Sequence, residues 1–213
     1  MAELDGPRWG PASKTAPRQL VVLCHGLGAD GHDLIDLAPT WSQALPDALF
    51  VSVDAPFLHA SGFGRQWWGV EDRSPPVVEA GVRSAAGFLN AFIDAELARL
   101  GIQDYALMGF SQGAMTALFT GLRRTSGPRA ILAFSGALIA PEKLQTEAAN
   151  HAPVLLVHGE ADDVVPVQRS RDAEAALRAA SLPVEAVYVP RLAHGIDDTG
   201  LSMGALTLQR AFA

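Results

Sequence analysis

The sequence predicts a single α/β domain with a mostly parallel central sheet and helices on both faces. Short, near-continuous apolar segments alternate with longer amphipathic ones along all 213 residues. Strands without a polar face are typical of a parallel sheet that helices cover on both sides. A chain of this length forms one domain that buries roughly 70% of the surface its unfolded form exposes.

The expected elements follow one another without internal repeats or low-complexity segments. Residues 1–18 are rich in glycine and proline, which favours a loose arm or one short edge strand, and residues 19–213 are expected to form the main domain. Core strands are expected near residues 19–24, 48–53, 104–109, 130–135, 153–159 and 184–189. Helices are expected near residues 32–44, 77–100, 111–124, 167–180 and 202–212.

The helix at about 77–100 has the clearest periodicity. Its apolar residues recur about every 3.6 positions, as on one face of an amphipathic helix: Val78, Val82, Ala85, Leu89, Phe92 or Ile93, and Leu100. No gap between the expected elements is long enough for a large helical cap domain, so we expect an open active site.

Gly109-Phe110-Ser111-Gln112-Gly113 lies between a short apolar run, residues 105–108, and a helical run, residues 114–119. The bare G-x-S-x-G pattern is common, but at a strand–turn–helix corner it is the nucleophile elbow of an α/β-hydrolase. The turn strains the serine backbone and requires small residues two positions to either side. Ser111 is therefore the predicted nucleophile, and a merely tight turn is the alternative.

In this fold the acid and then the base follow the nucleophile along the chain. Of six histidines, only His194 comes after an acid that itself lies beyond the following strands, with a surface loop histidine as the alternative. Glu160, Asp162 and Asp163 compete for the acid role after the strand at 153–159. Asp162 is favoured because it lies far enough past the strand to turn back. Asp163 is better placed to cap the helix that begins near Pro166.

An oxyanion hole needs two backbone N–H groups aimed at the developing charge. The residue after the nucleophile, Gln112, supplies one at the positive end of the following helix. The loop at residues 25–31 supplies the other, from Leu27, because its glycines let the backbone approach a ligand closely. Phosphate binding by this loop is the alternative, but the sequence has neither G-x-G-x-x-G nor a P-loop lysine.

These motifs together resemble the phospholipase/carboxylesterase family, which holds small bacterial carboxylesterases and acyl-protein thioesterases. The resemblance runs from about residue 18 to the C-terminus and rests on residues 25–31 (HGLGADG), residues 109–113 (GFSQG), His158-Gly159 with Asp162 and residues 164–166 (VVP), and His194-Gly195. It implies a triad of Ser111, Asp162 and His194, with Leu27 and Gln112 as the oxyanion donors.

Two departures from the family pattern favour the bacterial carboxylesterases over the protein-depalmitoylating thioesterases. Gly195 follows the histidine where the eukaryotic thioesterases usually carry serine. Residues 136–138 (GAL) lie where they tend to carry a tryptophan that lines the acyl site.

Residues 54–76 form the longest irregular segment expected, and loops of this length in a compact domain are usually functional. Phe63 and Trp68 are the candidate walls of an acyl pocket, with Leu138 and Val165 across its mouth. The alternative is that Trp67 and Trp68 pack beneath the loop. Without a cap the distal part of a long acyl chain stays in water, so short to medium chains are the expected substrates.

Composition excludes several other functions. The net charge is −7 with no cluster of lysine and arginine, which argues against binding to nucleic acid or an anionic membrane. Cys24, the single cysteine, can form no intrachain disulfide and is expected to be an inert buried residue. No apolar run is long enough to span a membrane, and the N-terminus lacks signal-peptide features, so a cytoplasmic location is expected.

We therefore expect a metal-independent and cofactor-independent serine carboxylesterase, as a monomer or homodimer, acting on a small-molecule ester. The histidines are scattered, and His25 and His158, each before a glycine at a strand end, are interpreted as loop structure. Acyl thioesterase or lysophospholipase activity would use the same groups on another leaving group. A hydrolase fold that binds a ligand without catalysis is the alternative from a different class.

Overall fold

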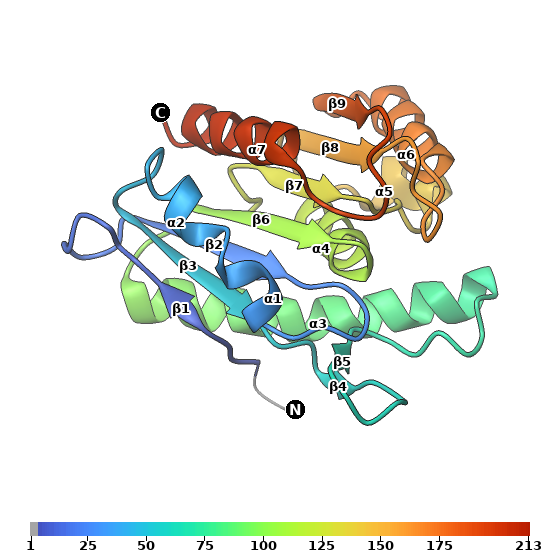
Figure 1. Cartoon of the computed structure of the whole chain (residues 1–213), viewed down its shortest axis with the longest axis horizontal. Helices are drawn as coiled ribbons and strands as arrows, with labels where there is room; N and C mark the ends of the chain where they lie inside the picture. Colours follow the sequence, from blue (N-terminus) through green and yellow to red (C-terminus); the bar gives the residue numbers. More distant parts are fainter. Residues whose placement is uncertain (1–3) are drawn as a thin grey trace.

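The computed structural model describes residues 4–213, and a seven-stranded sheet forms their centre (Figure 1). In the order of the sheet the strands are β1 (Arg8–Trp9), β3 (Ala48–Val53), β2 (Gln19–Cys24), β6 (Tyr105–Phe110), β7 (Ile131–Phe134), β8 (Val154–Gly159) and β9 (Val184–Val189). Only β1 runs antiparallel to its neighbour, so the carboxyl ends of the six parallel strands meet at one edge.

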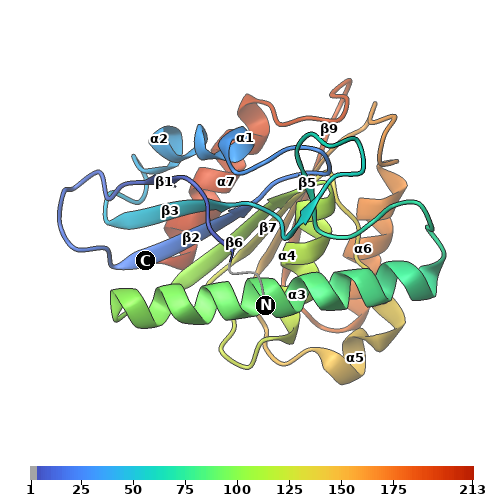
Figure 2. The same ribbon diagram turned by 90° about the horizontal axis from the view of Figure 1, so that it is seen from below.

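Helices cover both faces of this sheet (Figure 2). The longer helices are α3 (Pro75–Leu100), α4 (Gln112–Arg123), α6 (Gln168–Ala179) and α7 (Asp198–Ala211). The single-turn helices are α1 (His32–Ile35), α2 (Ala38–Trp41) and α5 (Leu144–Glu147). A 3₁₀ turn at Pro141–Lys143 precedes α5. Helices α3, α4 and α6 pack on one face, and α1, α2 and α7 on the other. The predicted class, a mostly parallel sheet between two helical layers without a large cap domain, is confirmed.

The core reflects the apolar character of both strand faces. Along β2, Leu20, Val22 and Cys24 join the core beneath α3 and α4, whereas Val21 and Leu23 join the core beneath α2 and α7. Because successive side chains of a strand point to opposite faces, a strand buried on both sides reads as a continuous apolar run.

Residues 4–18 extend along the edge of the sheet. The expected arm begins at residue 1, and its residues 1–3 lie outside the described part of the chain. Arg8 and Trp9 pair antiparallel with Val51 and Phe50. The rings of Trp9 and Phe50 meet edge to face, with centroids 6.3 Å apart.

The expectation of one continuous helix at residues 32–44 is wrong, because this segment forms two short helices, α1 and α2. Pro39 lies in the first turn of α2 and has no N–H group with which to continue the hydrogen bonds of α1.

Helix α7 begins earlier than the expected start near residue 202. The Asp197 side chain accepts a hydrogen bond from the amide of Gly200 (2.9 Å) and caps the helix four residues earlier.

The segment 54–76, expected to be irregular, contains a short antiparallel hairpin formed by β4 (Phe57–Leu58) and β5 (Arg65–Gln66). The hairpin also fixes the loop after β2, because the Gly28 amide donates to the Arg65 carbonyl (2.8 Å) and the Arg65 amide to the Ala29 carbonyl (2.7 Å). A side chain at Gly64 would lie 1.9 Å from the Gly28 carbonyl oxygen, so only glycine permits this approach.

The turn between β6 and α4 holds Ser111 at φ 54° and ψ −117°, a conformation that residues other than glycine rarely adopt. Its two neighbouring glycines permit the geometry. A Cβ atom at Gly109 would lie 2.3 Å from the Gly113 carbonyl oxygen, and one at Gly113 would lie 1.9 Å from the Cys24 carbonyl oxygen. The turn therefore brings β6, α4 and the end of β2 closer together than any side chain would allow.

We expect Gly113→Ala to lower the free energy of unfolding by about 3 kcal/mol or more, because the added methyl group meets backbone rather than a movable side chain. Gly87→Ala is the control. Gly87 lies within α3 with open space around its Cβ position, so alanine should raise stability by about 0.5–1 kcal/mol. Urea denaturation followed by circular dichroism measures both, and equal stability of the two variants would contradict the argument.

Candidate active site

Ser111 lines a cavity of about 460 Å³ at the carboxyl edge of the sheet. The serine precedes the first residue of α4, and its amide donates to the Phe134 carbonyl of β7 (2.9 Å). Leu27, Gln112 and His194 line the same cavity. Three of the loops that follow parallel strands thus meet around one space.

Asp162 and His194 form a hydrogen-bonded pair, with the Asp162 Oδ2 atom 2.7 Å from the His194 Nδ1 atom. Asp162 lies in the loop after β8, and His194 in the loop after β9. The ring of Phe110, next to the serine, packs against the His194 imidazole with centroids 4.7 Å apart. Because the carboxylate only accepts, His194 carries its proton on Nδ1 and leaves Nε2 free to accept one.

Asp162 is held by more than this pair. Its Oδ1 atom accepts hydrogen bonds from the amides of Val164 (2.9 Å) and Val165 (2.8 Å). Burial raises the pKa of Asp162, but the hydrogen bonds from His194, Val165 and Val164 outweigh burial and hold that pKa below its ordinary value. The carboxylate is therefore a fixed negative charge beside the imidazole.

His158 is a contact of Asp162 that the sequence analysis missed. Its Nε2 atom lies 3.1 Å from Asp162 Oδ2 and 2.8 Å from the Val165 carbonyl oxygen, both of which are acceptors, so Nε2 carries the proton. Its Nδ1 atom then accepts from the Ser170 hydroxyl (2.6 Å). His158 was interpreted as loop structure, but a histidine at the end of a buried strand, four residues before an acid, is the signal that could have identified it.

The two competing acids lie elsewhere. Glu160 forms a surface ion pair with Arg171 (2.8 Å). Asp163 is exposed, and the expectation that it caps the next helix is wrong. That helix begins at Gln168 with Val167 at its N-cap and no side-chain cap. Asp162 uses its own carboxylate to hold the loop, which leaves Asp163 without a structural role there.

Leu27 and Gln112, the expected oxyanion donors, flank Ser111 in the cavity wall. Within residues 4–213, neither backbone amide has a hydrogen-bond acceptor, so both remain available to a ligand. The Gln112 side chain has a further role that the sequence analysis did not anticipate. It accepts from the Trp67 amide (2.8 Å) and donates to the Trp68 carbonyl (2.9 Å), which ties the loop after β5 to the nucleophile turn.

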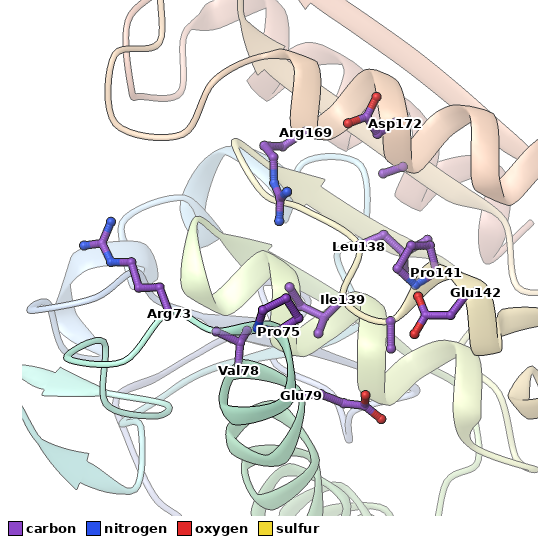
Figure 3. A pocket seen from close by; sticks show the side chains of 12 residues that line it. Arg73, Pro75, Val78, Glu79, Leu138, Ile139, Pro141, Glu142, Arg169 and Asp172 are labelled. Atoms are coloured by element: carbon purple, nitrogen blue, oxygen red, sulfur yellow. The ribbon is translucent and has the colours of Figure 1, made fainter.

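The expected substrate-binding residues divide into two groups. Trp68 and Val165 line the Ser111 cavity. Phe63 is 83% exposed at the tip of the β4–β5 hairpin and is not part of the cavity wall. Leu138 lines a neighbouring cavity of about 360 Å³, shown in Figure 3.

The two tryptophans have different surroundings. Trp67 is fully buried and donates from Nε1 to the His25 carbonyl (2.9 Å). Trp68 is 6% exposed and contributes both to the core under the loop and to the cavity wall. Both tryptophans therefore pack beneath the loop, and Trp68 also lines the cavity.

The remaining candidate groups, His25 and Cys24, are buried. Burial lowers the pKa of His25, whose Nδ1 atom lies 2.7 Å from the Gly26 carbonyl and whose Nε2 accepts from the Ala55 amide (3.0 Å). Burial raises the pKa of the Cys24 thiol at the end of β2. Across the described residues there is no cluster of three or more potential metal ligands, and no helix is long and apolar enough to cross a membrane.

Residues 11–207 match the Phospholipase/Carboxylesterase family. "Esterase YpfH" of Escherichia coli (strain K12) is 28% identical over 190 residues, which is 86% of this chain and 79% of that protein. "Acyl-protein thioesterase 1" of Kluyveromyces lactis is 30% identical over 178 residues, 76% of this chain and 78% of that protein. The crystal structure of esterase PE8 superposes with a TM-score of 0.93 and 40% identity, covering 99% of this chain and all of that one.

Fold and site thus define an α/β-hydrolase that carries a serine at a nucleophile elbow. The chain belongs to the phospholipase/carboxylesterase family. The resemblance found in the sequence is confirmed, and so is the predicted enzyme class, a carboxylic ester hydrolase.

The lowered pKa of Asp162 predicts an acid-dependent loss of stability. The ionised carboxylate stabilises the folded state above the unfolded-state pKa of about 3.9, and this contribution is lost as the pH falls through the lower folded-state value. We expect the wild-type Tm to exceed that of Asp162→Asn at pH about 6 and the difference to shrink below pH about 4. Thermal unfolding followed by circular dichroism measures this.

Asp163→Asn is the control for that experiment, because Asp163 is exposed and adjacent in sequence. Its Tm should follow the wild type across the whole pH range. A Tm difference between wild type and Asp162→Asn that stays constant with pH would show that Asp162 is not the stabilising charge.

Proposed function

We propose that Ser111, Asp162 and His194 form the catalytic triad of a serine carboxylesterase, and that the 460 Å³ cavity is its active site. The observation that carries the proposal is the presence of a strained nucleophile-elbow serine in the same cavity as a histidine hydrogen-bonded to a buried aspartate. In such a site Ser111 Oγ attacks the ester carbonyl while His194 Nε2 accepts its proton. Asp162 holds the imidazole tautomer and stabilises the imidazolium ion that forms.

The tetrahedral intermediate places a negative charge on the former carbonyl oxygen. The backbone amides of Leu27 and Gln112 are the proposed donors to it, and each such donor contributes roughly 3–4 kcal/mol where this has been measured. When the intermediate collapses, His194 gives its proton to the leaving alcohol and the acyl group stays on Ser111. His194 then activates a water molecule, which hydrolyses the acyl-enzyme.

The nearest alternative is a thioester or lysophospholipid substrate, because the same groups act on any activated acyl carbonyl. The acyl-protein thioesterase among the relatives supports it. An open site with local apolar walls favours short to medium carboxylic esters instead. A cytoplasmic location and a monomer or homodimer stay predictions from the sequence.

Covalent labelling by a fluorophosphonate probe tests the nucleophile directly. We expect the wild-type chain to be labelled and Ser111→Ala to be neither labelled nor active, with its fold intact because one hydroxyl leaves little space behind. Ser84→Ala, at an exposed position of α3, is the control and should label fully. A wild-type chain that is folded but unlabelled would instead indicate a ligand-binding protein without catalysis.

The acid assignment is tested by two adjacent variants. Asp162→Asn should lower kcat by about 10⁴-fold, because an amide at this position no longer holds the required imidazole tautomer. Asp163→Asn should stay close to wild type. Hydrolysis of p-nitrophenyl butyrate measures both, and the reverse result would assign the acid to Asp163.

Acyl-chain preference tests the cavity walls. We expect kcat/KM to peak at about four to eight carbons, since methylenes beyond the walls remain in water and gain little of the ~0.8 kcal/mol available on burial. Trp68→Ala should flatten this preference, while Phe63→Ala, at the exposed hairpin tip, should leave it unchanged. A series of p-nitrophenyl esters measures the profile, with circular dichroism to confirm folding. Palmitoyl esters as the best substrates would contradict the prediction.

A further inference from the structure

His25 is a fully buried histidine directly after β2, and the reaction steps described above leave it without a role. The Ala55 amide, in the loop after β3, donates to its Nε2 atom (3.0 Å), and its Nδ1 atom lies 2.7 Å from the Gly26 carbonyl oxygen. Since Nε2 is the acceptor, Nδ1 carries the ring proton and donates to the Gly26 carbonyl. Burial lowers the pKa of His25 and so favours this neutral form of the imidazole.

The Gly26 carbonyl belongs to the same peptide group as the Leu27 amide, which is one of the two proposed oxyanion donors. This peptide is trans and planar, so its C=O and N–H bonds point in opposite directions. A hydrogen bond that fixes the carbonyl therefore also fixes the direction of the Leu27 N–H bond. Accepting a hydrogen bond at the carbonyl polarises the peptide as well, which strengthens its N–H group as a donor.

This peptide lies beside the nucleophile turn. Gly26 and Leu27 both line the Ser111 cavity. A Cβ atom at Gly26 would lie 3.4 Å from the Ser111 Cβ atom and 3.2 Å from the Phe110 ring. Because the Leu27 amide has no acceptor among residues 4–213, its direction depends on the hydrogen bonds of the groups on either side of it.

Different parts of the chain hold the two sides of Leu27. After Leu27, the β4–β5 hairpin binds residues 28 and 29 through the backbone of Arg65. Before it, the Gly26 carbonyl accepts the short bond from His25 and a longer one from the Ala29 amide (3.3 Å). The Trp67 indole donates to the His25 carbonyl (2.9 Å), and its ring centroid lies 6.0 Å from that of the imidazole. The His25 side chain thus connects this peptide to the loop after β3.

We propose that His25 is a positioning residue for the oxyanion hole, and that its bond to the Gly26 carbonyl directs the Leu27 amide toward the developing oxyanion. The proposal rests on the function proposed above and adds a residue to it. His25 is not part of the cavity wall and acts through the backbone of the next two residues. A neutral ester carbonyl gains less from this donor than the charged oxygen of the tetrahedral intermediate does, so loss of His25 should affect kcat rather than KM.

Two substitutions separate this role from a purely structural one. An asparagine side chain places its amide nitrogen near the position of the His25 Nδ1 atom, whereas a glutamine side chain reaches the position of Nε2. His25→Asn therefore keeps the donor to Gly26 and loses the acceptor for the Ala55 amide, and His25→Gln does the reverse. Each variant leaves one buried backbone group without this partner, so we expect urea denaturation to show a similar loss of stability in both.

With p-nitrophenyl butyrate we expect His25→Gln to lower kcat by about 10- to 100-fold with little change in KM, since loss of a whole oxyanion donor costs about 10²–10³-fold. His25→Asn should keep most of the wild-type kcat. A trifluoromethyl ketone forms a tetrahedral adduct with a serine nucleophile, and its affinity for His25→Gln should fall by the same factor as kcat/KM. The matching methyl ketone should bind all variants equally.

His151→Gln, at an exposed position before β8, is the control for loss of a histidine and should leave kcat and KM unchanged. Equal losses of kcat in His25→Asn and His25→Gln would overturn the proposal, as would a wild-type kcat in folded His25→Gln. If neither variant folds, NMR correlation of the imidazole protons and nitrogens in the wild type decides the question. A proton on the His25 Nδ1 atom supports the proposal, and one on Nε2 contradicts it.

The proposed function and this role of His25 fail in different ways. A folded wild-type chain that hydrolyses no ester would overturn the function itself. An active wild type with equal losses in His25→Asn and His25→Gln would overturn only the role of His25.

Discussion

The contact between the nucleophile turn and the end of β2 constrains the arrangement around the site. The backbone of α4 at Gly113 approaches the Cys24 carbonyl so closely that no side chain fits between them. This approach fixes the start of α4 against the loop that carries Leu27, and the positive φ of Ser111 holds the serine between them. The proposed oxyanion donors and nucleophile therefore keep their relative positions through this backbone packing and through the backbone hydrogen bonds between β5 and the loop after β2.

Asp162 supplies a second fixed point at the same edge of the sheet. Its Oδ1 atom holds the loop at residues 164–165, and its Oδ2 atom faces both His194 and His158. A buried carboxylate with so many donors stays ionised and in one orientation, which is the state a triad acid requires. The loops after β8 and β9 are thus tied together through one side chain.

Gln112 holds one wall of the cavity in place through its side-chain hydrogen bonds. The residue lines the cavity, while its side chain holds the loop at Trp67 and Trp68, of which Trp68 also lines the cavity. One residue therefore connects the proposed oxyanion hole with the acyl wall.

The sequence by itself determined the fold class, the positions of the six parallel strands within about one residue, the elbow serine, and the chain order of the candidate acid and base. These features depend on local patterns: apolar runs, a glycine spacing, and the order of motifs along the chain. The role of His158, the position of Phe63 outside the cavity, and the neighbouring cavity that Leu138 lines were decided only by tertiary structure. Each depends on side chains from separate strands and helices that meet at one edge of the sheet, and no local pattern records which residues meet there.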